Sequence, residues 1–406
     1  MDANVEHGTM PPSGRPATTL FIAVAAGIAI ANNYALQPAL PAVAQTLHVS
    51  LAATGLIAGC LQIGYMTGIL LLAPLGDRIA PARLIGVQFF ALGTALLAAA
   101  LAPSLTALAV ACCVVGALAT NAVHLASAAF HLAPAAARGK ALGTVASGIS
   151  AGILLSRFAG GVLTQHAGWR GMLLCFGAVA ALLGIASMRA IPTVCDARPG
   201  SAGYWELLRS MPGLLLRHRL LREGILVGAC WFFVFSALWV TLALSLSDAP
   251  LRLDPTQVGL FGFAGLLGLL TTRPAGSLAD RLGFRPVIAL GLAAVLVGCV
   301  VLYASAASIP GIALGVVLFD TGCFAAQVAN QTRLLALEPS ARNRSYGTYM
   351  FAYYAAGALG SVLGPVLFAR AGWQPVCAVS AAIAGGGLLL TLLAHYAERD
   401  AAASRA

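Results

Sequence analysis

Charged side chains are scarce in this sequence: Asp, Glu, Lys and Arg together make up 9% of the 406 residues, whereas 60% of the residues are hydrophobic. Soluble proteins carry about 25% charged residues, because polar side chains must cover a surface that faces water. A chain of this length with so few charges cannot hide its apolar surface in one soluble core. We therefore expect a protein whose solvent is the lipid bilayer.

Cysteine patterns that bind metals or form disulfides are also missing. None of the nine cysteines forms a Cys-x-x-Cys pair, and most fall inside apolar runs as small buried residues. The sequence shows no metal-binding constellation, no nucleophile–base pair and no phosphate loop, which argues against an enzyme. We expect neither a cofactor nor a metal. The net charge of +10 does not indicate a nucleic-acid partner, because the positive residues stand in short segments between apolar runs.

Long apolar runs are what the sequence has instead, and a helix needs about 20 such residues to cross a bilayer. Twelve runs reach this length, at residues 19–41, 52–75, 82–102, 105–131, 140–164, 170–190, 223–247, 256–278, 286–307, 310–335, 345–369 and 373–396. The connections are short except for residues 191–222, which contain five arginines. This segment is typical of a linker with an amphipathic helix on the membrane surface.

The chain repeats itself at an interval of about half its length. Asp77-Arg78 recurs 203 residues later as Asp280-Arg281, and AGWR at 167–170 recurs 204 residues later as AGWQ at 371–374. Such self-similarity predicts a duplicated fold. We expect an all-α membrane protein with twelve transmembrane helices in two pseudo-symmetric six-helix bundles. The expected divisions are a tail (1–18), a first bundle (19–190), a linker (191–222), a second bundle (223–397) and a tail (398–406).

Basic residues gather on one side of this topology. Of the 23 Lys and Arg residues, 19 fall on the side of the termini and the linker, and three fall on the other side. The positive-inside rule predicts that the termini and the linker are cytoplasmic. The remaining basic residue, Arg157, lies well inside the fifth predicted span.

An Asp–Arg cluster follows the second span of each half, as APLGDRIAPAR (73–83) and GSLADRLGFRP (276–286). An acid adds nothing to a positive-inside signal, so we expect these clusters to latch helices together through charge-assisted hydrogen bonds. The alternative is that the charges only mark topology in a solvated loop.

The second cluster matches the signature loop G-x-L-A-D-R-x-G-R-[KR], so the chain resembles the major facilitator superfamily. The first copy has Ala73 and Ala80 in place of the two glycines. The layout and the Gly148-x-x-x-Gly152 ridge resemble the twelve-span bacterial drug:proton antiporter and sugar-efflux branch. The resemblance implies a monomeric transporter of the bacterial inner membrane, with latch residues Asp77, Arg78, Arg83, Gly276, Asp280, Arg281, Gly283 and Arg285.

Asp320 is the one acid of 13 that lies deep in a predicted span. It stands ten residues into the tenth run, roughly 15 Å from its end and near the bilayer midplane. An ionised carboxylate is costly there, which favours a group that binds and releases protons. The alternative is a protonated Asp320 that serves as structural glue between helices.

A central cavity is the second expectation from the resemblance, which implies that spans one, four, seven and ten line it. The expected lining residues are Asn32, Gln37, Asn121, His124, Arg157, Trp231, Trp239, Phe324 and Gln327. Several have a plain structural alternative: helix–helix hydrogen bonding for the polar residues of span four, a lipid-facing position for the tryptophans, and snorkelling to the headgroups for Arg157. Asn32 and Gln37 are stronger candidates, because amides that face lipid would go unpaired.

The expected function is a proton-coupled exporter of small amphipathic organic molecules that works by alternating access. Its partners would be the solute, protons and lipid. An importer or facilitator of a sugar or organic acid is the alternative, which Arg157 and the lack of an arginine ahead of Gly116 favour.

Overall fold

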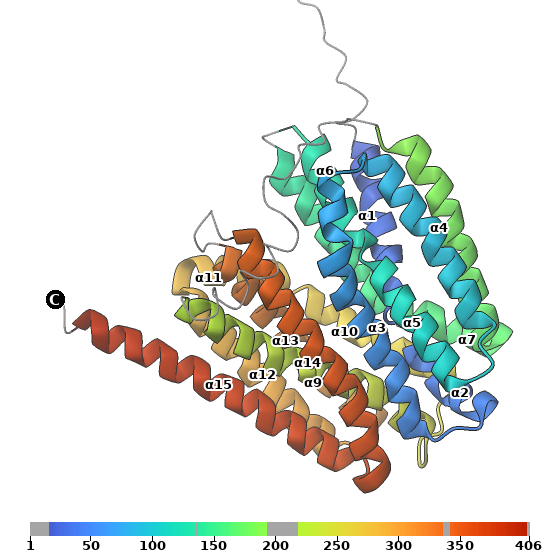
Figure 1. Ribbon diagram of the computed structural model, residues 1–406. Coiled ribbons are helices and arrows are strands. Elements are labelled where there is room, and N and C mark those ends of the chain that lie inside the picture. The colour runs from blue at the N-terminus through green and yellow to red at the C-terminus, as the bar shows by residue number, and fades with distance from the viewer. Residues whose placement is uncertain (1–15, 135–136, 193–217, 336–341, 404–406) are drawn as a thin grey trace, which may run out of the picture.

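The computed structural model describes residues 16–134, 137–192, 218–335 and 342–403, and within these ranges every regular element is a helix (Figure 1). The first half contains α1 (Pro16–Ala31), η2 (Gln37–Ala39), α2 (Leu40–Leu47), α3 (Leu51–Leu71), η3 (Ala73–Asp77), α4 (Pro81–Ala100), α5 (Leu105–Ala119), α6 (Asn121–Leu132) and α7 (Arg138–Ala190). The second half contains α9 (Arg219–Ser247), α10 (Pro255–Leu269), α11 (Thr272–Leu282), α12 (Phe284–Ala304), α13 (Ile309–Leu335), α14 (Arg342–Ala371) and α15 (Trp373–Ala403).

These elements form the twelve spans that the sequence predicts. Among the described residues, nine helices are long and apolar enough to cross a bilayer, with α5 and α6 counted as one, and α1 is a shorter apolar helix. The 53-residue α7 contributes two spans because it breaks at Gly168. α10 and α11 together make the eighth span, so the all-helical, twelve-span prediction is confirmed.

Two glycine turns explain one of the sequence repeats. Gly168 has φ +70° and Gly372 has φ +81°, and the two stand 204 residues apart in the repeated AGW motifs. A residue with a side chain avoids this left-handed region, whereas glycine enters it at little cost. The same tight turn therefore joins spans five and six and spans eleven and twelve.

The helix packing repeats in the same way. In the first half α1 and α4 pack on α7 and α3 packs on α5, while in the second half α9 packs on α14, α12 on α15 and α10 on α13. The two bundles meet where α3 packs on α14 and α7 packs on α10. This pairing is the pseudo-symmetry expected of a duplicated six-helix unit.

The bundles touch most closely on the side away from the linker. A side chain at Gly55 would meet Ser361 and Pro365 of α14, and one at Gly161 would overlap the Pro255 carbonyl of α10. At the other end of α7, a Cβ on Gly143 would have no neighbour within 4 Å in the described part of the chain. Figure 1 shows the bundles converging near α2 and diverging toward α6 and α11.

The first predicted span is not one continuous helix. α1 ends at Ala31, and a turn leads into η2 and α2; a regular α-helix cannot run on through Pro38, because proline has no N–H to donate to the carbonyl four residues earlier. The Asn32 amide donates to the carbonyls of Ile28 and Ala29, at 2.9 and 3.3 Å, and so satisfies acceptors that the helix end leaves open. The break carries Gln37 into the interior of the protein.

The two Asp–Arg loops differ in their backbone. Gly283 separates α11 from α12 with φ +88°, a conformation that favours glycine, whereas Ala80 precedes α4 with φ −53°. The degraded first copy therefore takes a different turn. Most of the predicted linker (193–217) lies outside the described residues, and α9 begins at Arg219.

Candidate functional site

Asp320 is fully buried in the middle of α13, and its carboxylate faces α9. The indole Nε1 of Trp239 donates to Asp320 Oδ1 at 3.0 Å, while Oδ2 has no hydrogen-bond partner. Oδ2 lies close to Gly265 of α10: a Cβ on this glycine would overlap Oδ2 and would also crowd Leu154 and Trp239. A buried carboxylate with one free oxygen is unusual, since buried polar atoms are almost always paired.

Arg157 of α7 is 1% exposed, so it does not reach the headgroups. Its Nε donates to Gln37 Oε1 at 2.8 Å and its Nη1 donates to the Ile153 carbonyl at 3.0 Å, while Nη2 has no partner. The guanidinium carbon lies 3.9 Å from the centroid of the Trp239 ring and 5.1 Å from that of Tyr34. Aromatic faces attract such a desolvated cation.

Trp239 thus contacts both charged groups: the N–H at the edge of its ring bonds to Asp320, and the face of its ring packs on Arg157. Arg157 and Asp320 do not form a direct ion pair within 4.0 Å, but Asp320 acts electrostatically on Arg157. The interaction between the two charges is therefore an indirect one across the two halves. A small pocket beside it, with room for about one water molecule, is lined by Gln37, Pro38, Arg157, Trp239, Leu242, Ala243, Leu246 and Val258.

Small residues make this approach possible. A Cβ on Gly259 would lie 2.7 Å from the Arg157 carbonyl, and one on Gly262 would lie 2.5 Å from the Leu154 carbonyl. The backbones of α7 and α10 therefore touch, as small residues allow in membrane helices. This contact brings Arg157 from the first half up to the helices of the second half.

An aromatic cluster extends from this site along α9 and α14, and most of its residues were not predicted from the sequence. The ring centroids of Phe232 and Tyr353 lie 3.7 Å apart, and those of Tyr65 and Tyr354 lie 4.6 Å apart across the two halves. Trp231 packs on Tyr353 at 4.9 Å and is buried, so it does not face lipid. The four tyrosines of the YGTYMFAYY segment (346–354) could have indicated this cluster.

The other predicted cavity residues are spread over several places. Asn121 donates to the Ile85 carbonyl at 3.1 Å and so ties α6 to α4. His124 packs on Gly76 in the loop that carries the first Asp–Arg cluster, and no contact joins it to Asp320. Phe324 is buried and Gln327 half-buried on α13. Asn32 bonds only to its own helix, as described above.

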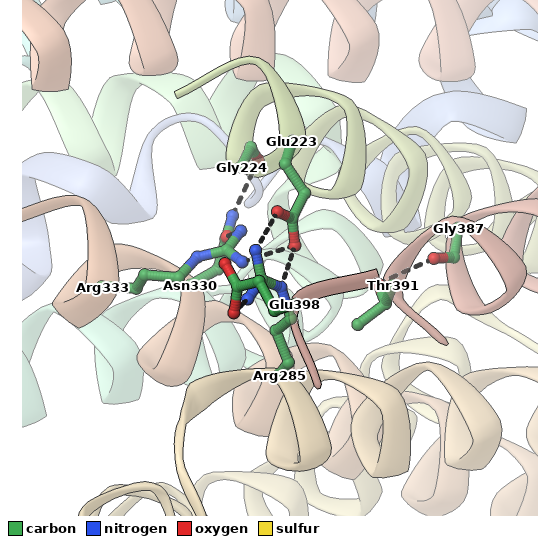
Figure 2. A network of polar contacts seen from close by, with 8 residues as sticks. All are labelled: Glu223, Gly224, Arg285, Asn330, Arg333, Gly387, Thr391 and Glu398. Carbon is green, nitrogen blue, oxygen red and sulfur yellow. Dashed lines mark hydrogen bonds and ion pairs between the residues drawn. The ribbon is translucent and has the colours of Figure 1, made fainter. Parts of the chain in front are cut away.

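The predicted latch residues divide into two groups. Arg78, Arg83 and Arg281 are exposed, and the side chains of Asp77 and Asp280 lie outside the described residues. The latch between these clusters stays a prediction. Arg285, which the signature loop includes, instead takes part in a network of buried charges on the linker side of the second half, shown in Figure 2.

Glu223 is the centre of this network. Arg285 donates to its two oxygens, from Nε at 2.9 Å and from Nη2 at 2.7 Å, and Arg333 Nη1 donates to it at 2.7 Å. Arg285 also pairs with Glu398, and Arg333 bonds to Asn330, so that α9, α12, α13 and α15 are joined (Figure 2). Arg285 was predicted only as a latch residue, and no role was predicted for its partner Glu223 or for Arg333.

Metal binding has no support in the described part of the chain, where no group of three His, Cys, Asp or Glu residues comes together. The eight cysteines described there are free thiols. The site is therefore built from one acid, one guanidinium and aromatic rings.

Residues 22–248 and 224–405 each match the sequence profile of the Major Facilitator Superfamily. The chain belongs to this superfamily. It is 32% identical over 375 residues to the uncharacterized transporter YgaY of Escherichia coli O157:H7, covering 92% of this chain and 95% of the relative. It is also 32% identical to the probable transporter SCO4007 of Streptomyces coelicolor, covering 91% of this chain and 86% of the relative.

Solved structures agree on the superfamily fold. A bacterial homologue of the human lysosomal transporter Spinster, in an inward-facing and occupied conformation, aligns with a TM-score of 0.75 at 15% identity over 94% of this chain and 96% of that one. The nucleoside transporter NupG aligns with a TM-score of 0.74 at 13% identity over 92% and 98% of the chains. This major facilitator protein is therefore a multi-pass membrane transporter and not an enzyme.

Proposed function

We propose that the protein is a proton-coupled secondary transporter of small amphipathic organic molecules, with Asp320 as the proton carrier. The observation that carries this proposal is the Asp320 carboxylate, which is fully buried at mid-span with only one of its oxygens hydrogen-bonded. The ionised form of a carboxylate is costly at this depth, and the free oxygen is where a proton can bind. An acid with a free oxygen beside the interface of the halves has room to gain and lose a proton as its surroundings change.

The arrangement of the halves supports alternating access. Tight glycine contacts close the side away from the linker, and the linker-side ends of the same helices diverge (Figure 1). We propose that this state faces the cytoplasm, with both termini and residues 191–222 on that side of a bacterial inner membrane. Rocking of the halves about the central site would then expose it to the other side. Each chain holds a complete site, so we expect a monomer to work alone.

Export by proton antiport is the first candidate, as in the efflux branch that the sequence resembles. A second candidate, uptake of an organic acid, gains support from Arg157. This cation is buried in the site and keeps one N–H donor free, which suits an anionic solute. The aromatic rings around it suit a solute with an apolar body.

Sealed inside-out vesicles with an imposed pH gradient test proton coupling. Amphipathic cations, sugars and organic acids are added in turn, and proton movement is recorded for the wild type and for Asp320→Asn. We expect solute-dependent proton movement that disappears in the variant. Asp248→Asn, which removes an exposed carboxylate, is the matched control and should behave as the wild type does. A solute transport rate that changes neither with the pH gradient nor with the Asp320→Asn substitution would contradict the proposal. The protein would then be an uncoupled facilitator.

A further inference from the structure

We propose that the solute is a monovalent organic anion, which binds to Arg157 and is carried together with one proton on Asp320. The inference rests on the proposed role of Asp320 as proton carrier. It favours the organic-acid candidate over proton antiport and adds the charge of the solute and the stoichiometry. It starts from the charges that the site can hold. Both charged residues are almost completely buried, with Arg157 1% and Asp320 0% exposed.

Before a solute binds, the net charge of the site is zero when Asp320 is ionised, because the negative charge of Asp320 offsets the positive charge of Arg157. Protonation of Asp320 alone would leave a buried net charge of +1, and binding of an anion alone would leave −1. Both are costly in a low-dielectric interior. Protonation together with binding of one anion returns the site to neutrality, so proton and anion each favour the binding of the other.

The free atoms of the site fit this exchange. Arg157 Nη2 is a buried donor without a partner, and Asp320 Oδ2 is a buried acceptor without a partner. An anionic headgroup would accept from Nη2, and a proton on Oδ2 would supply a donor to a second headgroup oxygen. Charge-assisted hydrogen bonds from a guanidinium are among the strongest that a protein offers to a carboxylate or sulfonate.

Other titratable groups at the site do not disturb this balance. Tyr34, in the turn between α1 and η2, faces Arg157, and Cys323 lies near Asp320 on α13, with Cys299 of α12 close to Cys323. Phenols and thiols are neutral near pH 7. Among the described groups, the charge of the site therefore depends on Arg157, Asp320 and the solute.

A cationic solute fits this site poorly. It would stand beside Arg157 in the same desolvated space, and the single negative charge of Asp320 cannot offset two cations. A neutral solute would leave the donor of Arg157 without a charged partner. Transport of one proton with one monovalent anion moves no net charge, so the pH gradient alone would drive it and the membrane potential would have no effect.

The test uses three aryl probes of fixed charge with the purified full-length chain: benzenesulfonate, benzamide and benzyltrimethylammonium. Calorimetric titration in two buffers of different ionisation enthalpy gives the number of protons taken up per ligand. We expect benzenesulfonate to bind with uptake of one proton and with an affinity that falls about tenfold per pH unit once Asp320 is ionised. In proteoliposomes its proton-coupled uptake should not change when valinomycin and potassium set the membrane potential.

Two variants separate the roles of the charges. Arg157→Gln should weaken benzenesulfonate binding by roughly 30-fold or more, since it removes one partner of a buried charge pair. Asp320→Asn should still bind the anion, without proton uptake and with an affinity that no longer depends on pH. Arg370→Gln removes an exposed arginine and should bind as the wild type does.

The outcomes distinguish the two proposals. Proton uptake or release that accompanies benzyltrimethylammonium or benzamide, but not benzenesulfonate, keeps the proton-carrier function and overturns the anion assignment. Benzenesulfonate binding in the wild type, with no proton exchange for any of the three probes, overturns both. Absence of benzenesulfonate binding, or transport that the membrane potential drives, overturns the anion assignment and its stoichiometry.

Discussion

The guanidinium carbon of Arg157 stacks 3.9 Å from the centroid of the Trp239 ring, and this contact joins the two halves of the protein at their centre. Arg157 belongs to the first half and Trp239 to the second. The same indole donates its N–H to Asp320. Any movement that separates the halves must therefore remove the aromatic face from the guanidinium, which gives the site a direct link to the conformation of the protein.

Trp239→Phe should impair proton coupling. Phenylalanine keeps an aromatic face for Arg157 but cannot donate to Asp320, which leaves a buried acceptor without a partner at a cost of about 1–3 kcal/mol. We expect a less stable protein and slower proton-coupled transport, measured by thermal unfolding and by vesicle assay. Trp231→Phe is the comparison for stability, because the Trp231 indole N–H has no partner to lose. Equal losses in the two variants would contradict a role for the bond to Asp320.

Gln37→Glu should abolish transport without unfolding the protein. A carboxylate of the same size at the Gln37 position would pair with Arg157 Nε, now 2.8 Å from the amide oxygen, and supply a permanent counter-charge. Gln37→Leu should destabilise the protein by about 1–3 kcal/mol, since it leaves a buried donor unsatisfied. Thermal unfolding and solute uptake measure both effects. Normal uptake by the Glu variant would show that the charge of Arg157 is not needed for transport.

Gly265→Ala should be harmful although it is a small change in a helix. The new Cβ would overlap Asp320 Oδ2 and would lie 2.9 Å from Leu154 Cδ2. We expect loss of most proton-coupled transport with a measurable loss of stability. Gly385→Ala is the matched control, because a Cβ there meets nothing in the described structure within 4 Å. That control should be neutral or stabilising by about 0.5–1 kcal/mol, as expected for Gly to Ala in a helix.

Gly161→Ala should shift the protein away from the conformation described here. Its Cβ would overlap the Pro255 carbonyl where the halves close, whereas Gly143→Ala adds a Cβ to open space on the same helix. Hydrogen–deuterium exchange should become faster at the start of α10 in the first variant and stay unchanged in the second. Equal exchange in both would argue against closure at this contact.

Glu223→Gln should destabilise the second bundle strongly. It would leave Arg333 buried without a counter-charge and Arg285 with only the exposed Glu398, and a buried charge that loses its partner typically costs about 3–5 kcal/mol. Glu398→Gln removes a 58% exposed partner of the same arginine and should cost less than about 1 kcal/mol. Thermal unfolding of the two variants measures the difference. A similar loss in both would contradict the central position of Glu223.

The fold could be predicted from the sequence, because hydropathy indicates where the membrane spans lie and repeated motifs indicate equivalent positions in the two halves. Runs of apolar residues gave the twelve spans, and the AGW repeats coincide with the turns at Gly168 and Gly372. The break after Ala31 was missed, because the apolar composition continues through it and only the prolines signal it. A hydropathy profile depends on side-chain polarity alone and therefore does not show where a helix ends within an apolar run.

The site was predicted in part. Burial of Asp320 followed from its depth in a span, whereas the contact of Arg157 with Gln37 and Trp239 depends on the meeting of three helices from both halves. The partner of Arg285 could not be inferred, because Glu223 lies 62 residues away. Contacts between distant segments depend on packing that periodicity alone does not reveal.

The three ion pairs found among the described residues, all centred on Glu223 and Arg285, lie within the second half. None of them crosses to the first half, so a rocking motion can leave each one intact. The two bundles would separate mainly at the expense of van der Waals contacts and aromatic stacking. Because salt screens charges rather than dispersion forces, the rate of interconversion between the two conformations should depend little on ionic strength.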